Sequence, residues 1–177
     1  IIGEAMNRNW NKDWRKSIII MSGGFDPIHK GHLRMFREAS WLGHHVVVGL
    51  NSDEWLTRKK GKPFMNFEER KEIIEGFKYV NQVIPFDDSD DTASDLIRRV
   101  HTIYDGKEFE YNYEDSGHQG MVDYYQIYFA NGGDRGKGNV PELDVCRELD
   151  VTMLWGVGGG KIQSSSWLIN GGKDGEV

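Results

Sequence analysis

Two histidines, His29 and His32, stand three residues apart where a predicted helix begins. The apolar run 18–21 precedes them and predicts a short strand that is buried on both faces. Between strand and helix, Gly23 and Gly24 permit backbone conformations that other residues avoid, and they let a ligand approach the main chain closely. Two imidazoles at a helix start add hydrogen-bond donors beside the free N–H groups and the positive end of the dipole. This arrangement predicts a phosphate-binding site.

The histidine pair also has two structural interpretations. Two imidazoles can ligate a metal ion, although no third ligand stands near them in the sequence. They can also serve only as caps for the free N–H groups of the helix. The sequence alone leaves both alternatives open beside phosphate binding.

Length, charge and cysteine usage restrict the class of protein. The chain has 177 residues, enough for one domain with a sizeable core. Its formal net charge is -6, so no basic surface favours nucleic acid as a partner. Cys146 is the single cysteine, which precludes a disulfide within the chain and fits a reducing compartment. No apolar run approaches the length of a membrane span. We therefore expect a cytoplasmic protein that binds neither nucleic acid nor a membrane.

Apolar runs and helical patterns alternate along the chain. The runs predict five strands, at 18–21, 45–50, 83–86, 127–130 and 151–155. This alternation predicts an α/β fold, a doubly wound (Rossmann-like) parallel five-stranded sheet with helices on both faces. Glycine- or serine-rich loops follow the first, fourth and fifth strands. Because ligands bind beyond the carboxyl ends of such strands, we expect these loops to converge on one crevice.

We expect one domain over residues 17–170, an N-terminal arm at 1–16 and a tail at 171–177. The inserted segment 102–125 has no clear periodicity and is rich in tyrosine and acidic residues. So many aromatic residues argue against disorder, and Tyr111 and Tyr113 alternate with polar residues as in a half-buried strand. We therefore expect an ordered excursion that covers a sheet edge or a subunit partner and takes no part in catalysis.

The stretch His29-Lys30-Gly31-His32 resembles the HxGH signature of the nucleotidyltransferase superfamily, also called cytidylyltransferase-like. Five further stretches keep the superfamily's order: GLNSDEW, TRKKGKP, FEERKEIIEGFKYVNQVIPF, NGGD and QSSS. The resemblance covers about 18–168 apart from the inserted segment. The sequence is most similar to adenylyltransferase domains that make ADP-heptose, and next to glycerol-phosphate cytidylyltransferases.

The resemblance implies an enzyme in which a substrate phosphate attacks the α-phosphate of a nucleoside triphosphate and pyrophosphate leaves, without a covalent enzyme intermediate. It implies a nucleoside triphosphate and a phosphorylated sugar or alcohol as ligands, and Mg²⁺ that arrives with the nucleotide. We expect ATP as the preferred nucleotide, with CTP as the alternative, and a homodimer. A nucleotide-binding module without turnover is the other alternative, which the intact histidines, lysines and serines disfavour.

Such a reaction needs an in-line arrangement and positive charge over the phosphates rather than a strong base, because the nucleophile is already charged. The expected catalytic residues are His29, His32, Lys59, Lys60 and Ser164. The expected nucleotide contacts are Gly23, Gly24, Phe25, Gly31, Gly132, Asp134, Lys161 and Ser165. Gly31 is explained by the bulk of the triphosphate, which a side chain there would block. Asp26 is expected near the acceptor phosphate and the metal.

Several of these residues also have plain structural interpretations. The basic loop expected at 57–62 can be a solvated surface, and Gly132 and Asp134 can simply form a turn. The serine run can be a helix cap. Glu69 and Arg70 match a superfamily position, but we expect them to form a structural ion pair.

Overall fold

The structure is a computed structural model that describes residues 17–43, 45–105, 108–110, 122–132 and 140–171. Its strands are β1 (Ser17–Gly23), β2 (His45–Leu50), β3 (Gln82–Pro85), β4 (Glu108–Glu110), β5 (Val122–Tyr124), β6 (Gln126–Gly132) and β7 (Thr152–Val157). Its helices are α2 (Lys30–Leu42), α3 (Asp53–Lys60), α4 (Phe67–Glu75), α5 (Ser94–Tyr104), α6 (Glu142–Glu148) and α7 (Ser165–Ile169). Among the described residues, no helix has the length and apolar character needed to cross a membrane. The expected arm at 1–16 and nearly all of the expected tail lie outside the described residues.

Five parallel strands form the main sheet in the order β3-β2-β1-β6-β7. The chain therefore first adds β2 and β3 on one side of β1, and later adds β6 and β7 on the other side. This confirms the doubly wound parallel sheet predicted from the sequence. The reversal between β1 and β6 opens a crevice at the carboxyl ends of the strands, which is where such sheets bind ligands.

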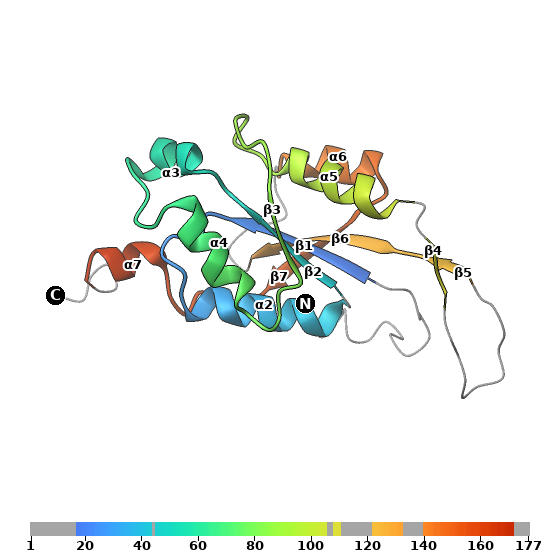
Figure 1. Cartoon of the computed structure of the whole chain (residues 1–177), viewed down its shortest axis with the longest axis horizontal. Helices are drawn as coiled ribbons and strands as arrows, with labels where there is room; N and C mark the ends of the chain where they lie inside the picture. Colours follow the sequence, from blue (N-terminus) through green and yellow to red (C-terminus); the bar gives the residue numbers. More distant parts are fainter. Residues whose placement is uncertain (1–16, 44, 106–107, 111–121, 133–139, 172–177) are drawn as a thin grey trace.

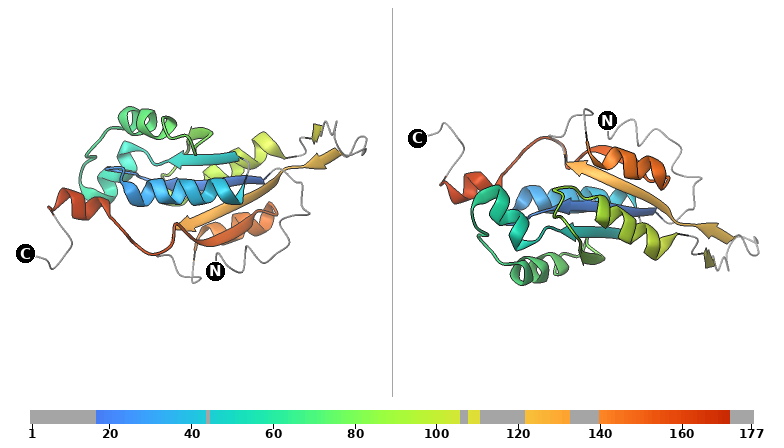
Figure 2. Two further views of the ribbon diagram at one scale, coloured as in Figure 1. Left: turned by 90° about the horizontal axis from the view of Figure 1, so that it is seen from below. Right: turned by 90° about the horizontal axis from the view of Figure 1, so that it is seen from above.

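Alternate residues of the central strand face two separate hydrophobic cores. Ile18 and Ile20 pack towards α5 and α6, whereas Ile19 and Met21 pack towards α2 and α4. All four side chains are fully buried. Figures 1 and 2 show these helix pairs on opposite faces of the sheet. A strand buried on both faces is typical of parallel sheets with helical crossovers.

The basic stretch expected as a loop at 57–62 is helical over most of its length. Thr57 to Lys60 form the end of α3, and Gly61, at φ 91°, terminates it. The helix begins at a Ser52 cap, whose hydroxyl accepts a hydrogen bond from the Trp55 N–H. The expectation of a loop was wrong because three basic side chains in the last helical turn stabilise the negative end of the dipole.

The inserted segment begins as the last turn of α5 and continues into a two-stranded ribbon. β4 and β5 pair antiparallel with each other as a separate sheet, and neither pairs with an edge strand of the main sheet. The ribbon projects at the end of the sheet opposite to α3 and α7 (Figures 1 and 2). Residues 106–107 and 111–121, which include Tyr111 and Tyr113, lie outside the described residues, so what they cover stays a prediction.

One fully buried guanidinium joins the loops at the carboxyl edge of the sheet. Arg70 donates from Nη1 to the carbonyls of Gly24 (2.8 Å) and Asn51 (2.9 Å), which follow β1 and β2. Its Nε donates to the Met65 carbonyl (3.0 Å), just before α4, and its Nη2 pairs with Asp53 Oδ1 (2.6 Å). Arg70 thus forms a structural ion pair, but its partner is Asp53 and not the expected Glu69.

Replacing Arg70 with Met should lower the free energy of unfolding by about 3–5 kcal/mol, because several buried acceptors lose their donor at once. Urea titration followed by circular dichroism measures the loss. Arg98→Met is the matched control, since Arg98 pairs with Glu148 (2.7 Å) at the surface and should cost much less. Equal losses in the two variants would contradict this role of Arg70.

Candidate functional site

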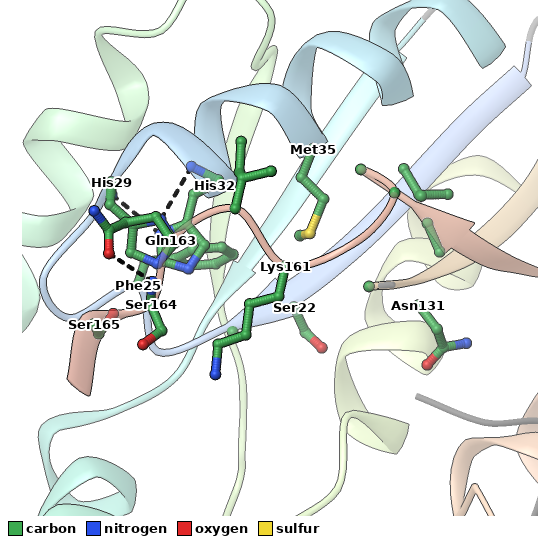
Figure 3. A pocket seen from close by; sticks show the side chains of 18 of the residues that line it. Ser22, Phe25, His29, His32, Met35, Asn131, Lys161, Gln163, Ser164 and Ser165 are labelled. Carbon is green, nitrogen blue, oxygen red and sulfur yellow. Dashed lines mark hydrogen bonds between the residues drawn. The ribbon is translucent and has the colours of Figure 1, made fainter. Parts of the chain in front are cut away.

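A cavity of about 360 Å³ lies at the carboxyl ends of β1, β6 and β7. Its walls are the loop after β1, the first turns of α2, the end of β6 and the segment 157–165 after β7 (Figure 3). The described parts of the three loops expected to converge on one crevice all line this cavity. Of the expected site residues, those lining the cavity are Gly23, Gly24, Phe25, His29, Gly31, His32, Gly132, Lys161, Ser164 and Ser165.

His29 and His32 cap the start of α2 reciprocally. His29 Nδ1 accepts from the Gly31 N–H (3.1 Å), and His32 Nδ1 accepts from the His29 N–H (3.3 Å). The rings stack with their centroids 3.7 Å apart. Because Nδ1 is an acceptor in both rings, the hydrogen-bond network assigns the ring proton of each neutral imidazole to Nε2. Capping and ligand binding are thus compatible, since each cap leaves an Nε2–H donor free to face a ligand.

Both imidazoles resist protonation. Burial lowers the pKa of His32 to about 3, with smaller contributions from His29 and from the charge of Lys60. Burial, followed by the charges of Lys60 and Lys161, also lowers the pKa of His29. Neutral rings at physiological pH act as hydrogen-bond donors and not as cations. Positive charge at the site comes from the lysines and the N-terminal end of α2.

The small residues of the motif serve the packing of these rings. A Cβ added at Gly31 would lie 2.9 Å from His29 Cε1, so the close neighbour of this glycine is the first histidine itself. The Phe25 ring packs edge-on against His32, with centroids 4.9 Å apart. A Cβ at Gly23 would meet that Phe25 ring at 3.0 Å. These glycines therefore allow the aromatic and imidazole rings to pack closely at the head of α2.

The two lysines expected over the phosphates diverge. Lys60 Nζ donates to the Asp26 carbonyl (3.0 Å) and lies close enough to the histidines to affect their pKa values. Lys59 Nζ pairs with Asp91 (3.3 Å), in the loop after β3, and lies 5.7 Å from the centroid of the Trp55 ring. Successive residues of a helix point about 100° apart, so both side chains cannot face one ligand easily. Only Lys60 is placed beside the cavity.

Asp26 has a structural environment and does not line the cavity. It is 1% exposed, and its two carboxylate oxygens accept from the Phe64 and Met65 N–H groups at 2.7 Å each. Both oxygens thus already accept backbone N–H groups, and the expected position near an acceptor phosphate and a metal stays a prediction. Among the described residues, no group of three histidine, cysteine or acidic side chains is placed to hold a metal ion.

The serine run caps a helix and closes the cavity. Ser164 Oγ accepts from the Trp167 N–H (3.1 Å), and Ser165 Oγ donates to the Pro27 carbonyl (2.8 Å). The second bond ties the start of α7 to the turn before His29. Lys161 Nζ lies 4.6 Å from the centroid of the Trp167 ring, and its side chain reaches into the cavity region in Figure 3.

Several lining residues were not individually predicted as site residues from the sequence, although some lie in loops expected at the crevice. They include Met35, Asn131 and Gln163, together with the glycine run 158–160. Met35 follows His32 by three positions, so helical periodicity could have placed both on one face. Asn131 begins the NGGD stretch and could have been named with Gly132. The expected contact Asp134 lies outside the described residues and stays a prediction.

Comparison with known proteins identifies relatives. A family profile described as cytidylyltransferase-like matches residues 20–127. Glycerol-3-phosphate cytidylyltransferase of Bacillus subtilis is 35% identical over 79 residues, which are 45% of this chain and 61% of that protein. The bifunctional protein HldE of Wolinella succinogenes is 34% identical over 109 residues, or 55% of this chain and 23% of that protein. The chain thus spans less than two thirds of each of these relatives.

One solved structure supports the fold. The lipopolysaccharide core biosynthesis protein of Thermoplasma volcanium superimposes with a TM-score of 0.52 at 21% sequence identity. The match covers 78% of this chain and 92% of that one.

The lowered pKa of His32 predicts a pH-dependent stability. Below about pH 6.5, His32 binds a proton in the unfolded chain but stays neutral in the folded protein. The free energy of unfolding therefore falls as the pH falls towards the folded pKa of about 3. His32→Gln removes this contribution. Between about pH 7 and pH 5, the wild type should lose about 2 kcal/mol more free energy of unfolding than the variant. Urea titrations at each pH measure the two slopes, and parallel slopes would contradict a buried, neutral His32.

Proposed function

The chain belongs to the cytidylyltransferase-like family, and on this premise we propose that it is a nucleotidyltransferase. It transfers a nucleoside monophosphate from a nucleoside triphosphate to a phosphorylated sugar or alcohol and releases pyrophosphate. An oxygen of the acceptor phosphate forms a bond to the α-phosphorus, and the bond from that phosphorus to the bridging oxygen of the β-phosphate breaks.

The observation that carries this proposal is the reciprocal histidine cap at the start of α2, which assigns an Nε2–H donor to each ring. His29 and His32 both accept backbone N–H groups at Nδ1, so their remaining donors are directed by the fold and need no reorientation. Fixed donors in a partly buried site stabilise charge that moves to a leaving group. Lys60 and Lys161 supply positive charge close by. Nothing in this arrangement acts as a strong base, and a phosphate nucleophile requires none.

Magnesium enters this proposal as a partner of the nucleotide. The described residues that line the cavity include no carboxylate, whereas Mg²⁺ in proteins is usually held by one or two carboxylates together with substrate phosphates and water. The nearby carboxylate of Asp26 is already bonded to backbone. The described chain therefore does not fit a dedicated protein-held ion, and we derive no step through it. Mg²⁺ would be held on the phosphate oxygens.

We propose ATP as the preferred nucleotide, with CTP as the alternative. The support is the resemblance of two stretches, NGGD and FDDSDD (86–91), to sugar-phosphate adenylyltransferases. NGGD carries more of this support, because the second stretch does not line the cavity. In that stretch Asp88 is 4% exposed and accepts from Asn51 and Ser52, which is a structural role. A homodimer, a cytoplasmic location and the absence of nucleic-acid and membrane partners stay predictions.

Pyrophosphate release from ATP, CTP, GTP and UTP, each with Mg²⁺, tests the proposal. The acceptors are glycerol 3-phosphate, a panel of sugar 1-phosphates and a phosphoalcohol. We expect release with ATP fastest and CTP second, and release with CTP alone would overturn the choice of nucleotide. Thermal stabilisation by a nucleotide without any pyrophosphate release would favour a binding module without turnover.

His29→Ala and His32→Ala should each lower turnover by about 100-fold or more, because each removes a donor to the charged phosphates. His29→Asn separates the two roles of the first histidine. Asparagine retains an oxygen that can accept the Gly31 N–H, so the cap survives, but the distal donor is gone. We expect wild-type thermal stability and the same loss of turnover. His101→Ala on α5 is the control, and full activity in any of the three site variants would contradict the assigned roles.

A further inference from the structure

A buried acid on α2 contacts the far wall of the cavity. Glu38 is 9% exposed and lies six residues after His32 on the same helix. Its Oε2 accepts from the Gly158 N–H at 2.7 Å, and its Oε1 accepts from Arg34 Nε at 3.2 Å. A buried carboxylate is stable only when it is paired and hydrogen-bonded. Both requirements are met here by one neighbour on the helix and one amide that is 120 positions away.

The loop that Glu38 contacts cannot fix its own shape. Gly156, Gly158 and Gly159 have φ values of 73°, 89° and 65°, a region that glycine enters without steric cost. The same freedom makes glycine costly to order on folding. Within the loop, one turn bond runs from the Gly159 N–H to the Gly156 carbonyl at 3.1 Å. A contact from outside the loop is therefore needed to hold it.

The loop also packs directly on α2. A Cβ at Gly158 would lie 2.9 Å from Met35 Cγ, and a Cβ at Gly159 would lie 2.6 Å from Arg34 Nη2. The segment 157–165 is thus joined to the rest of the site at two places. Glu38 holds its beginning, and the bond from Ser165 to the Pro27 carbonyl holds its end.

We infer that Glu38 is a positioning residue that sets the glycine loop as the wall for the nucleoside part of the nucleotide. The inference rests on the proposed function, which puts the phosphates at the histidine pair. The rest of the cavity, lined by Met35, Asn131 and Gly158, is then left for the ribose and base. One rigid helix carries the phosphate donors at its start and holds the loop from its middle, so it fixes the separation of the two ends of the ligand. Glu38 acts on nucleotide affinity and not on the chemical step.

The test compares Glu38→Met with Glu38→Gln. The two side chains have similar length and helix propensity, but only glutamine offers an oxygen to the Gly158 N–H. Glu38→Asp is a second loss variant, because its carboxylate stops one methylene short. Glu75→Met, an exposed glutamate on α4, is the matched control.

Two readouts are measured on each protein. In the first, limited trypsin digestion reports opening of the loop through cleavage after the exposed Lys161, relative to cleavage after Lys78, which is exposed in the turn that follows α4. Loss of the hydrogen bond to the Gly158 N–H should accelerate cleavage after Lys161 by about tenfold or more in the Met and Asp variants. In the second, the KM for the nucleoside triphosphate should rise by about tenfold while kcat changes by less than about threefold. Glu38→Gln and Glu75→Met should stay close to wild type in both.

Unchanged cleavage after Lys161 would overturn the inference, as would faster cleavage with an unchanged KM or an equal loss in Glu38→Gln and Glu38→Met. The proposed function fails by a different result. If the wild-type protein releases no pyrophosphate from any of the four nucleotides, then the proposed function is wrong. In that case the assignment of the glycine loop as the wall for the nucleoside is wrong too.

Discussion

The carboxyl edge of the sheet depends on one buried cation. A guanidinium with no exposure to solvent is tolerated only if its donors are satisfied, and Arg70 meets this condition with three backbone carbonyls and one carboxylate. Its carbonyl partner Met65 belongs to the pair of residues whose N–H groups hold the Asp26 carboxylate. The Asp26 carbonyl in turn accepts from Lys60. A continuous series of hydrogen bonds therefore connects the start of α4 to the lysine that lies beside the histidines.

The histidine pair shows how a helix cap can also serve a ligand. The N–H groups at the start of α2 need acceptors, and the two Nδ1 atoms provide them. This use of Nδ1 fixes the tautomer, and burial keeps both rings neutral. Neutral donors keep the same hydrogen-bonding pattern across the physiological pH range. The charge that phosphates require is left to Lys60, which lies close to the rings, and to Lys161, which lines the cavity.

Local sequence signals predicted the fold and the part of the site that lies at the start of α2. The apolar runs identified all five strands of the main sheet, because each strand is an apolar run bounded by polar or turn residues, and the central strands β1 and β2 are buried nearly throughout. The glycines and histidines after β1 identified the cavity because the strand, the turn and the helix cap follow one another directly in the sequence. The side-chain directions of Lys59 and Asp26 were not predictable, because each is set by a tertiary partner more than thirty residues away. Glu38 carries no local signal at all, since its amide partner lies in the last loop of the sheet.

The central claim is that His29 and His32 present two Nε2–H donors to a triphosphate. Two-dimensional NMR of the ¹⁵N-labelled imidazoles at neutral pH tests it directly, before and after addition of ATP and Mg²⁺. The account predicts an unprotonated Nδ1 and a protonated Nε2 in both rings, with both Nε2–H resonances shifting when the nucleotide binds. A protonated Nδ1 in either ring, or Nε2–H resonances that do not respond to a nucleotide that binds, would contradict it.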